Sequence, residues 1–308
     1  MSKHWWQQRE RGNVLAMKLI SHVSLRLGRR TGRALLYPIC LYFVLFAPVG
    51  RRASRDYLRR VFGRAPTWRE VFAHHYSFAS VLLDRAFLLA GRCELFAVER
   101  EGAELIFERM QRARGCLLLG AHYGSFDLTR VMGAHRYGHE VTMLMYQENA
   151  KKLNAVIASL RGPYPMKTIP IGGIEAMLRA QECVDAGGII GMLGDRVFAS
   201  EKTVTVPFLG APVTLPAGPF LIAKALKIPI VLFFVVHKGN NEYVEHFELL
   251  TEEVDLDRRH QQRDLEKWAR AYAARLEYFC RLAPYNWFNF YDYWHDRAPT
   301  SAPAAKGL

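Results

Sequence analysis

The sequence predicts an α/β fold, a mixed, mainly parallel sheet sandwiched by helices and preceded by an N-terminal helical segment. From residue 93 onward, short apolar runs alternate with longer stretches whose apolar residues recur every three or four positions. Runs such as residues 230–236 are apolar without interruption, which is typical of strands that helices cover on both faces. Before residue 93 the spacing is helical throughout.

The N-terminal region, residues 1–92, is predicted to contain only helices. An amphipathic stretch opens at Trp5 and Trp6, an uncharged segment covers residues 34–49, and a short helix covers residues 55–62. After a break at Pro66, residues 68–89 have the spacing of one long helix.

Residues 93–297 are predicted to form the α/β domain. The predicted strands are residues 116–119, 141–146, 167–171, 188–193, 204–208, 228–236 and 244–250. The predicted helices are residues 126–138, 150–161, 174–186, 216–227 and 263–282. Residues 298–308 are small, polar and proline-containing, and we expect a disordered tail.

The net charge of +13 is concentrated in the N-terminal region. Residues 1–70 hold 15 Lys and Arg but 3 Asp and Glu, whereas the rest of the chain is almost balanced, with 27 basic and 26 acidic residues. Arginine clusters flank the sixteen uncharged residues 34–49, which is unusual for a nucleic-acid-binding surface and favours an anionic lipid surface. Five scattered cysteines without a CxxC pair are typical of a reduced compartment and not of a zinc site.

The uncharged segment is predicted to lie in a membrane interface or to re-enter it. It is shorter than the roughly twenty residues that a spanning helix needs, and Pro38 and Pro48 interrupt it. A buried helical hairpin with basic ends is the alternative. No secretory signal is visible.

His122 and Asp127 follow the apolar residues 116–119, at the mouth of a predicted buried strand. The spacing His-x4-Asp/Glu occurs three times in the chain, so the context of this copy matters more than its spacing. Gly124 suits a sharp strand-to-helix turn, and Ser125 is a candidate N-cap of the helix that carries Asp127. Either the pair transfers a proton, the carboxylate holding the imidazole, or His122 is a surface histidine beside a helix N-terminus.

A second predicted strand end also carries charged residues. Asp195 and Arg196 follow residues 188–193. Because ligands of such sheets bind beyond the carboxyl ends of the strands, we expect proton transfer at His122 and an anionic group at Arg196.

Four sequence blocks occur in series: GAHYGSFD (residues 120–127), GMLGDRVF (residues 191–198), VTVPFLGAPVTLPAGPFLIAKALKIPIV (residues 204–231) and YNWFNFYDYW (residues 285–294). With these blocks, the chain resembles the lysophospholipid acyltransferase superfamily, and within it the lipid A biosynthesis (late) acyltransferase branch. The blocks occur in the family's order and, with the basic N-terminus, cover nearly the whole chain.

The resemblance implies an acyltransferase in which His122 is the general base and Asp127 orients it. His122 would deprotonate a hydroxyl or amine of a lipid or glycolipid-type acceptor, which attacks the thioester of an acyl carrier protein or of acyl-CoA. The acceptor itself is the nucleophile, so no metal or cofactor is expected. The implied location is the cytoplasmic face of the inner membrane, peripheral or monotopic, on anionic lipid.

The resemblance also implies substrate-binding residues. Gly124 and Ser125 are candidates for holding the developing oxyanion, and Asp195 and Arg196 would line the pocket, with Arg196 on a phosphate. Arg196 replaces the glutamine of the lipid A enzymes, and several of those enzymes have Glu in place of Asp127. These two departures argue against a dedicated lipid A enzyme. In its overall sequence, the chain resembles a group of acyltransferases of this branch that are associated with aryl polyene or related pigment lipids.

Two other functions stay open. A serine-type lipid esterase or hydrolase would use Ser125, although no Gly-x-Ser-x-Gly turn surrounds it. A non-catalytic membrane-binding protein would use the basic N-terminus alone and would leave the charged strand ends without a role.

Overall fold

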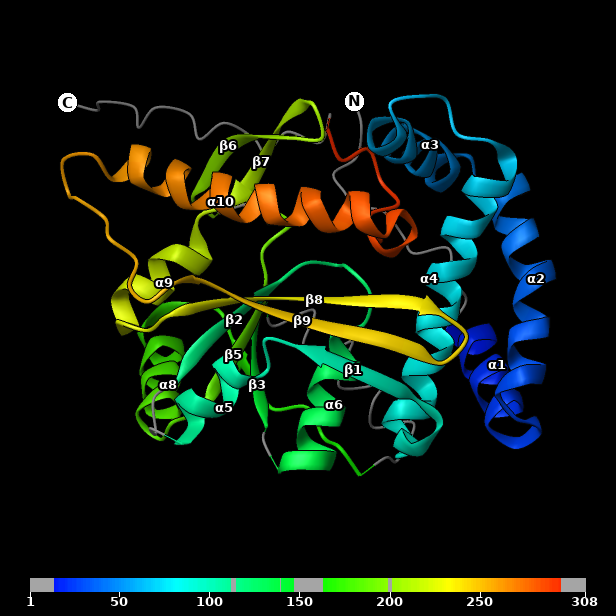
Figure 1. The fold of residues 1–308 in the computed structure, drawn as a ribbon, viewed down its shortest axis with the longest axis horizontal. Coiled ribbons are helices and arrows are strands. Elements are labelled where there is room, and N and C mark those ends of the chain that lie inside the picture. Colours follow the sequence, from blue (N-terminus) through cyan, green and yellow to red (C-terminus); the bar gives the residue numbers. More distant parts are fainter. Residues whose placement is uncertain (1–13, 112–114, 139, 147–162, 199–200, 295–308) are drawn as a thin grey trace, which may run out of the picture.

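The computed structural model describes residues 14–111, 115–138, 140–146, 163–198 and 201–294 (Figure 1). The helices are α1 (Val14–Leu27), α2 (Arg29–Phe46), α3 (Pro48–Phe62), α4 (Trp68–Leu89), α5 (Glu104–Gln111), α6 (Phe126–Tyr137), α8 (Gly173–Asp185), α9 (Gly218–Leu226) and α10 (Gln261–Leu282), with 3₁₀ turns η2 (Cys93–Leu95) and η3 (Pro284–Asn286). The strands are β1 (Ala97–Glu101), β2 (Cys116–Gly120), β3 (Val141–Met145), β4 (Thr168–Pro170), β5 (Ile189–Leu193), β6 (Thr203–Phe208), β7 (Ala211–Pro216), β8 (Ile230–Gly239) and β9 (Glu242–Thr251).

Seven strands form one sheet in the order β1-β9-β8-β2-β5-β3-β4. The pairing of β8 with β9 is antiparallel, and the other neighbours in this sheet are parallel. The predicted α/β fold with a mixed, mainly parallel sheet is thus confirmed. Because β2 and β5 are parallel neighbours, with Gly120 opposite Leu193, their carboxyl ends open at the same edge of the sheet.

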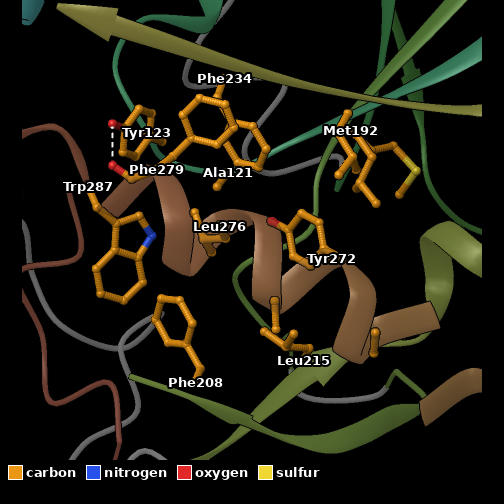
Figure 2. Packing of buried hydrophobic residues seen from close by; sticks show 14 of the residues in the cluster. Ala121, Tyr123, Met192, Phe208, Leu215, Phe234, Tyr272, Leu276, Phe279 and Trp287 are labelled. Atoms are coloured by element: carbon orange, nitrogen blue, oxygen red, sulfur yellow. Dashed lines mark hydrogen bonds between the residues drawn. The ribbon is translucent and has the colours of Figure 1, made fainter. Parts of the chain in front are cut away.

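Helices cover both faces of this sheet, and successive residues of a strand alternate between them. Leu117 and Leu119 of β2 belong to the hydrophobic cluster that includes α8, α9 and α10. Cys116 and Leu118 belong to the cluster on the other face, with α4 and α6. Figure 2 shows the first cluster. In this cluster the aromatic ring of Phe279 on α10 stacks on the ring of Phe234 on β8, with 4.4 Å between the ring centroids.

Two parts of the sheet arrangement differ from the prediction. The predicted strand 204–208 is β6, which pairs with β7 in a separate antiparallel hairpin. The strands β1 and β7 and the helix α5 are absent from the prediction. The edge strand β1 lacks the apolar run of a buried strand, because three of its five residues are charged. The predicted helix 150–161, the stretch at Trp5 and the tail 298–308 lie outside the described residues.

The N-terminal helices stand together at one end of the sheet, beside the β8–β9 turn (Figure 1). No single described helix is long and apolar enough to cross a membrane. Taken together, α2 and α3 have the length and the apolar composition of such a helix, but a bend of 92° lies between them. α4 ends at Leu89 and η2 begins at Cys93, and the domain boundary between residues 92 and 93 stays a prediction.

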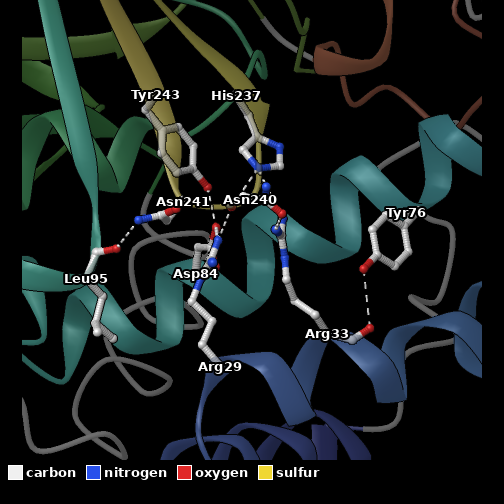
Figure 3. Close-up of polar contacts among 9 residues, drawn as sticks. All are labelled: Arg29, Arg33, Tyr76, Asp84, Leu95, His237, Asn240, Asn241 and Tyr243. Atoms are coloured by element: carbon white, nitrogen blue, oxygen red, sulfur yellow. Dashed lines mark hydrogen bonds and ion pairs between the residues drawn. The ribbon is translucent and has the colours of Figure 1, made fainter.

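A largely buried ionic cluster joins α2 to α4 and to the strands β8 and β9 (Figure 3). The carboxylate of Asp84 on α4 is fully buried and accepts two hydrogen bonds from Arg29, at 2.6 and 2.7 Å, and one from Tyr243 Oη at 2.7 Å. One turn along α2, Arg33 lies 3.2 Å from His237 Nε2. The direction of α2 relative to the sheet is therefore fixed by charge pairing as well as by apolar packing.

Candidate active site

The His122–Asp127 motif lies on a tight turn between β2 and α6. Gly124 has φ +59°, and a Cβ atom there would overlap the Val235 carbonyl oxygen, so the position requires glycine. Ser125 is the N-cap of α6, and its Oγ accepts a hydrogen bond from Leu128 N at 3.2 Å, as the sequence predicts. The turn places His122 at the carboxyl edge of the sheet.

The C-terminal block, residues 285–294, holds this turn through two backbone hydrogen bonds. Gly124 N donates to Asn286 O at 2.7 Å, and Phe288 N donates to His122 O at 2.7 Å. Because the Gly124 N–H is already engaged by Asn286, the structure does not support Gly124 as a hydrogen-bond donor to an oxyanion. Ser125 is 4% exposed and its hydroxyl serves as a helix cap, so its substrate-binding role stays a prediction.

The carboxylate that contacts the imidazole belongs to Asp195, directly after β5. His122 Nδ1 lies 2.7 Å from Asp195 Oδ1, and the backbone N–H of His122 donates to Asp195 Oδ2 at 3.1 Å. Asp195 is fully buried, whereas the His122 side chain is 31% exposed. A carboxylate accepts the Nδ1 proton, so Nε2 is left as the basic nitrogen.

Two side chains from the C-terminal block complete the surroundings of Asp195. Trp287 Nε1 donates to Oδ2 at 3.1 Å, and Asn289 Nδ2 donates to the same oxygen at 2.9 Å. Burial alone would raise the pKa of Asp195, but the nearby His122 and Arg196 and the Asn289 hydrogen bond together hold it below its ordinary value. Asp195 is therefore ionised in the folded protein.

The pKa of His122 is lowered from its ordinary value of 6.5. Burial is the main cause, and the positive charge of Arg196 adds to it, while Asp195 acts in the opposite direction. Near neutral pH the imidazole is therefore uncharged and able to accept a proton.

The structure corrects the prediction that Asp127 orients His122. Asp127 Oδ2 lies 2.6 Å from Arg85 Nε, and Asp127 Oδ1 lies 3.2 Å from Arg130 Nη2. Arg85 is on α4, so Asp127 joins the N-terminal helices to α6. The helix that begins after the turn carries Asp127 away from the imidazole, and the adjacent strand end supplies Asp195 in its place.

Arg196 is half-buried and contacts the C-terminal block. Its Nε donates to Asn289 Oδ1 at 2.7 Å, and its Nη2 donates to Phe288 O at 3.0 Å. The guanidinium also lies over the Tyr291 ring, 5.8 Å from its centroid. The predicted contact of Arg196 with a substrate phosphate stays a prediction.

The sequence identified Asp195 as a residue of the site but did not predict its contact with His122 Nδ1, and it missed Trp287, Asn289 and Arg85. A sequence signal for Trp287 and Asn289 exists, because both belong to the aromatic block 285–294, but the sequence does not show what this block contacts. Among the described residues, no group of three or more His, Cys, Asp or Glu side chains is arranged to hold a metal ion.

Residues 89–296 match the sequence profile of the bacterial lipid A biosynthesis acyltransferase family. This range contains β2, β5 and the C-terminal block that together build the His122–Asp195 site. No individual curated protein matches the chain. Because the matched range covers more than half of the sequence, the chain belongs to the bacterial lipid A biosynthesis acyltransferase family.

Proposed function

We propose that this protein transfers a fatty acyl group from a thioester donor to a hydroxyl or amine of a lipid or glycolipid-type acceptor, with His122 as general base. Membership of the family supports acyl transfer to a lipid acceptor in general. The observation that supports His122 is its geometry: Nδ1 is held by the buried, ionised Asp195, and the ring is partly exposed at the carboxyl edge of the sheet.

In the proposed reaction, the acceptor O–H or N–H gives its proton to His122 Nε2 as the oxygen or nitrogen attacks the thioester carbonyl. A bond forms from the acceptor atom to the carbonyl carbon, and a tetrahedral oxyanion results. The C–S bond then breaks, and the leaving thiolate takes the proton back from the imidazolium. Asp195 stabilises the transient imidazolium. Its pKa lies below its ordinary value, so it stays ionised and does not take the proton from the imidazolium.

The hydrolase alternative is less favoured by the structure. A serine nucleophile needs an accessible hydroxyl whose proton a base can take. Ser125 is 4% exposed, and its Oγ accepts from the backbone of α6. The acceptor molecule, and not Ser125, is therefore the proposed nucleophile.

The proposed location is the cytoplasmic face of the inner membrane. One face of α2 packs on the protein through Leu36, Cys40 and Val44. The rest of the helix shows large apolar side chains that are half exposed or more, namely Tyr37, Leu41, Tyr42, Leu45 and Phe46. Exposed arginines flank this apolar surface, namely Arg26, Arg30, Arg52, Arg55 and Arg59. Apolar side chains beside arginines suit the headgroup region of an anionic leaflet.

The proposal is tested with purified protein, vesicles of total bacterial membrane lipid, and radiolabelled palmitoyl thioester of either acyl carrier protein or CoA. The wild type is expected to form labelled lipid with at least one donor, and His122→Ala to form none. The control is His135→Ala, because His135 is an exposed histidine with the same spacing to an acidic residue. Transfer by His122→Ala at the wild-type rate would overturn the proposal, and label released only as free fatty acid would favour the hydrolase.

A further inference from the structure

Asn289 connects Arg196 to the carboxylate that holds the catalytic imidazole. The residue is 1% exposed, and both ends of its side-chain amide are engaged. Its Oδ1 accepts from Arg196 Nε at 2.7 Å, and its Nδ2 donates to Asp195 Oδ2 at 2.9 Å. A guanidinium has donors only and a carboxylate has acceptors only, so these two neighbours define one orientation of the amide.

On the basis of the proposed function, we propose that Arg196 and Asn289 are positioning residues that act in series. Arg196 fixes the amide of Asn289, and Asn289 fixes the carboxylate of Asp195 against His122. Neither residue needs to contact the substrate in order to act on the rate.

The hydrogen bonds that the two oxygens of Asp195 make explain how the loss of Arg196 or Asn289 would lower the rate. Oδ2 receives the backbone N–H of His122, the Trp287 indole and the Asn289 amide, while Oδ1 faces His122 Nδ1. Without Arg196, Asn289 Oδ1 loses the hydrogen bond from the arginine Nε, and the amide is held by Asp195 at one end only. The Asn289–Asp195 hydrogen bond then varies more in its geometry, and Asp195 is held less firmly against the imidazole.

This role differs from binding a substrate phosphate, because it depends on a hydrogen bond and not on a positive charge. The substitution Arg196→Gln distinguishes the hydrogen-bonding role from the binding of a phosphate. The glutamine Nε2 is separated from the backbone by the same number of atoms as the arginine Nε, so it can donate to Asn289 Oδ1 without carrying charge. Lysine keeps the charge but lacks a donor at that branch point.

The test compares Arg196→Met, Arg196→Gln, Arg196→Lys, Asn289→Ala and the Met/Ala double variant in steady-state transfer from palmitoyl-CoA or the palmitoyl carrier protein. Arg196→Met and Asn289→Ala are each expected to lower kcat about tenfold to a hundredfold with KM within about twofold. The double variant is expected to be no slower than the slower single variant, because residues in series do not contribute independently. Arg196→Gln is expected to recover most of the rate, and Arg196→Lys less.

The matched control is Arg275→Met, which removes a partly buried arginine of α10 that is paired with Glu248 of β9. It is expected to leave kcat unchanged, and thermal unfolding of every variant separates misfolding from mispositioning. A raised KM with unchanged kcat, rescue by lysine but not by glutamine, or multiplicative losses in the double variant would overturn the proposal.

A second readout does not depend on turnover. In NMR spectra of histidine-labelled protein, the Nδ1–H of His122, assigned with His122→Gln, is expected to shift or broaden in Arg196→Met and Asn289→Ala and to be retained in Arg196→Gln. If the wild type transfers no acyl group, the proposed function fails while this spectrum still decides the positioning role. An identical resonance in all variants would overturn the positioning role alone.

Discussion

Acid should destabilise this protein through His74, a histidine on α4 that contacts Trp287 of the candidate active site. The side chain is fully buried, with Nδ1 2.8 Å from Ser54 Oγ and Nε2 2.8 Å from Trp287 O. A carbonyl can only accept, so Nε2 carries the hydrogen and the Ser54 hydroxyl donates to Nδ1. Burial, which outweighs the hydrogen bond to Trp287, lowers the pKa of His74 to about 3.

The sign and size of the effect follow from proton linkage. The unfolded chain binds a proton at the ordinary histidine pKa of about 6.5, whereas the folded protein does so only near pH 3. Stability is therefore lost as pH falls from about 6.5 toward about 3, at about 1.4 kcal/mol for each pH unit. Between pH 7 and pH 5, His74 should account for a loss of about 2 kcal/mol in the free energy of unfolding.

Urea unfolding of the wild type and His74→Gln at about pH 7 and about pH 5 measures this contribution. Glutamine can donate to Trp287 O and accept from Ser54, but it does not titrate in this range. The wild type is expected to lose about 2 kcal/mol more than His74→Gln over that interval. His260→Gln, at an exposed position on the surface, is the control. Equal losses in the wild type and His74→Gln would refute the reasoning.

Two further predictions concern the turn that carries His122 and the proposed membrane-binding surface of α2. Gly124→Ala would force a Cβ atom into a backbone carbonyl of β8 at a positive φ, so we expect a loss of about 3 kcal/mol or more in urea unfolding; an unchanged midpoint would contradict this. Phe46→Glu removes a side chain that is 64% exposed on α2, and we expect at least about tenfold weaker binding to vesicles containing anionic lipid. Leu282→Glu changes a similarly exposed side chain on α10 and should bind like the wild type; equal weakening of both would argue against α2 as the lipid-binding surface.

The position of the site was predictable from the sequence, but the pairing within it was not. His122 and Asp195 each follow an apolar run, and the carboxyl ends of parallel strands meet at one edge of the sheet. Which carboxylate reaches the imidazole depends on the order of the strands, and β5 lies directly beside β2. A spacing of five residues suggested Asp127, but Asp127 belongs to a helix that leads away from the ring.

The C-terminal contribution to the site depends on contacts between residues far apart in the sequence. Trp287 and Asn289 reach Asp195 across 92 and 94 positions. Composition and periodicity describe each segment separately, so they identify an aromatic block without showing what it packs against. The same limit applies to Arg85, whose partner Asp127 is on another helix.

The central claim is that Asp195, and not Asp127, orients His122 for proton transfer, and the comparison of Asp195→Asn with Asp127→Asn tests it most directly. In Asp195→Asn, an amide NH₂ in the place of Oδ1 would donate to Nδ1, which places the ring proton on Nε2 and removes the base. The kcat for acyl transfer from the palmitoyl thioester is then expected to fall about a thousandfold or more, with the fold retained.

Asp127→Asn removes a charge from a buried pair with Arg85 and Arg130, so it is expected to lower the free energy of unfolding by about 3 kcal/mol. The kcat of its folded fraction should stay within about tenfold of the wild type, because the His122–Asp195 contact is intact. A thousandfold loss of kcat in well-folded Asp127→Asn, with Asp195→Asn still active, would contradict the account.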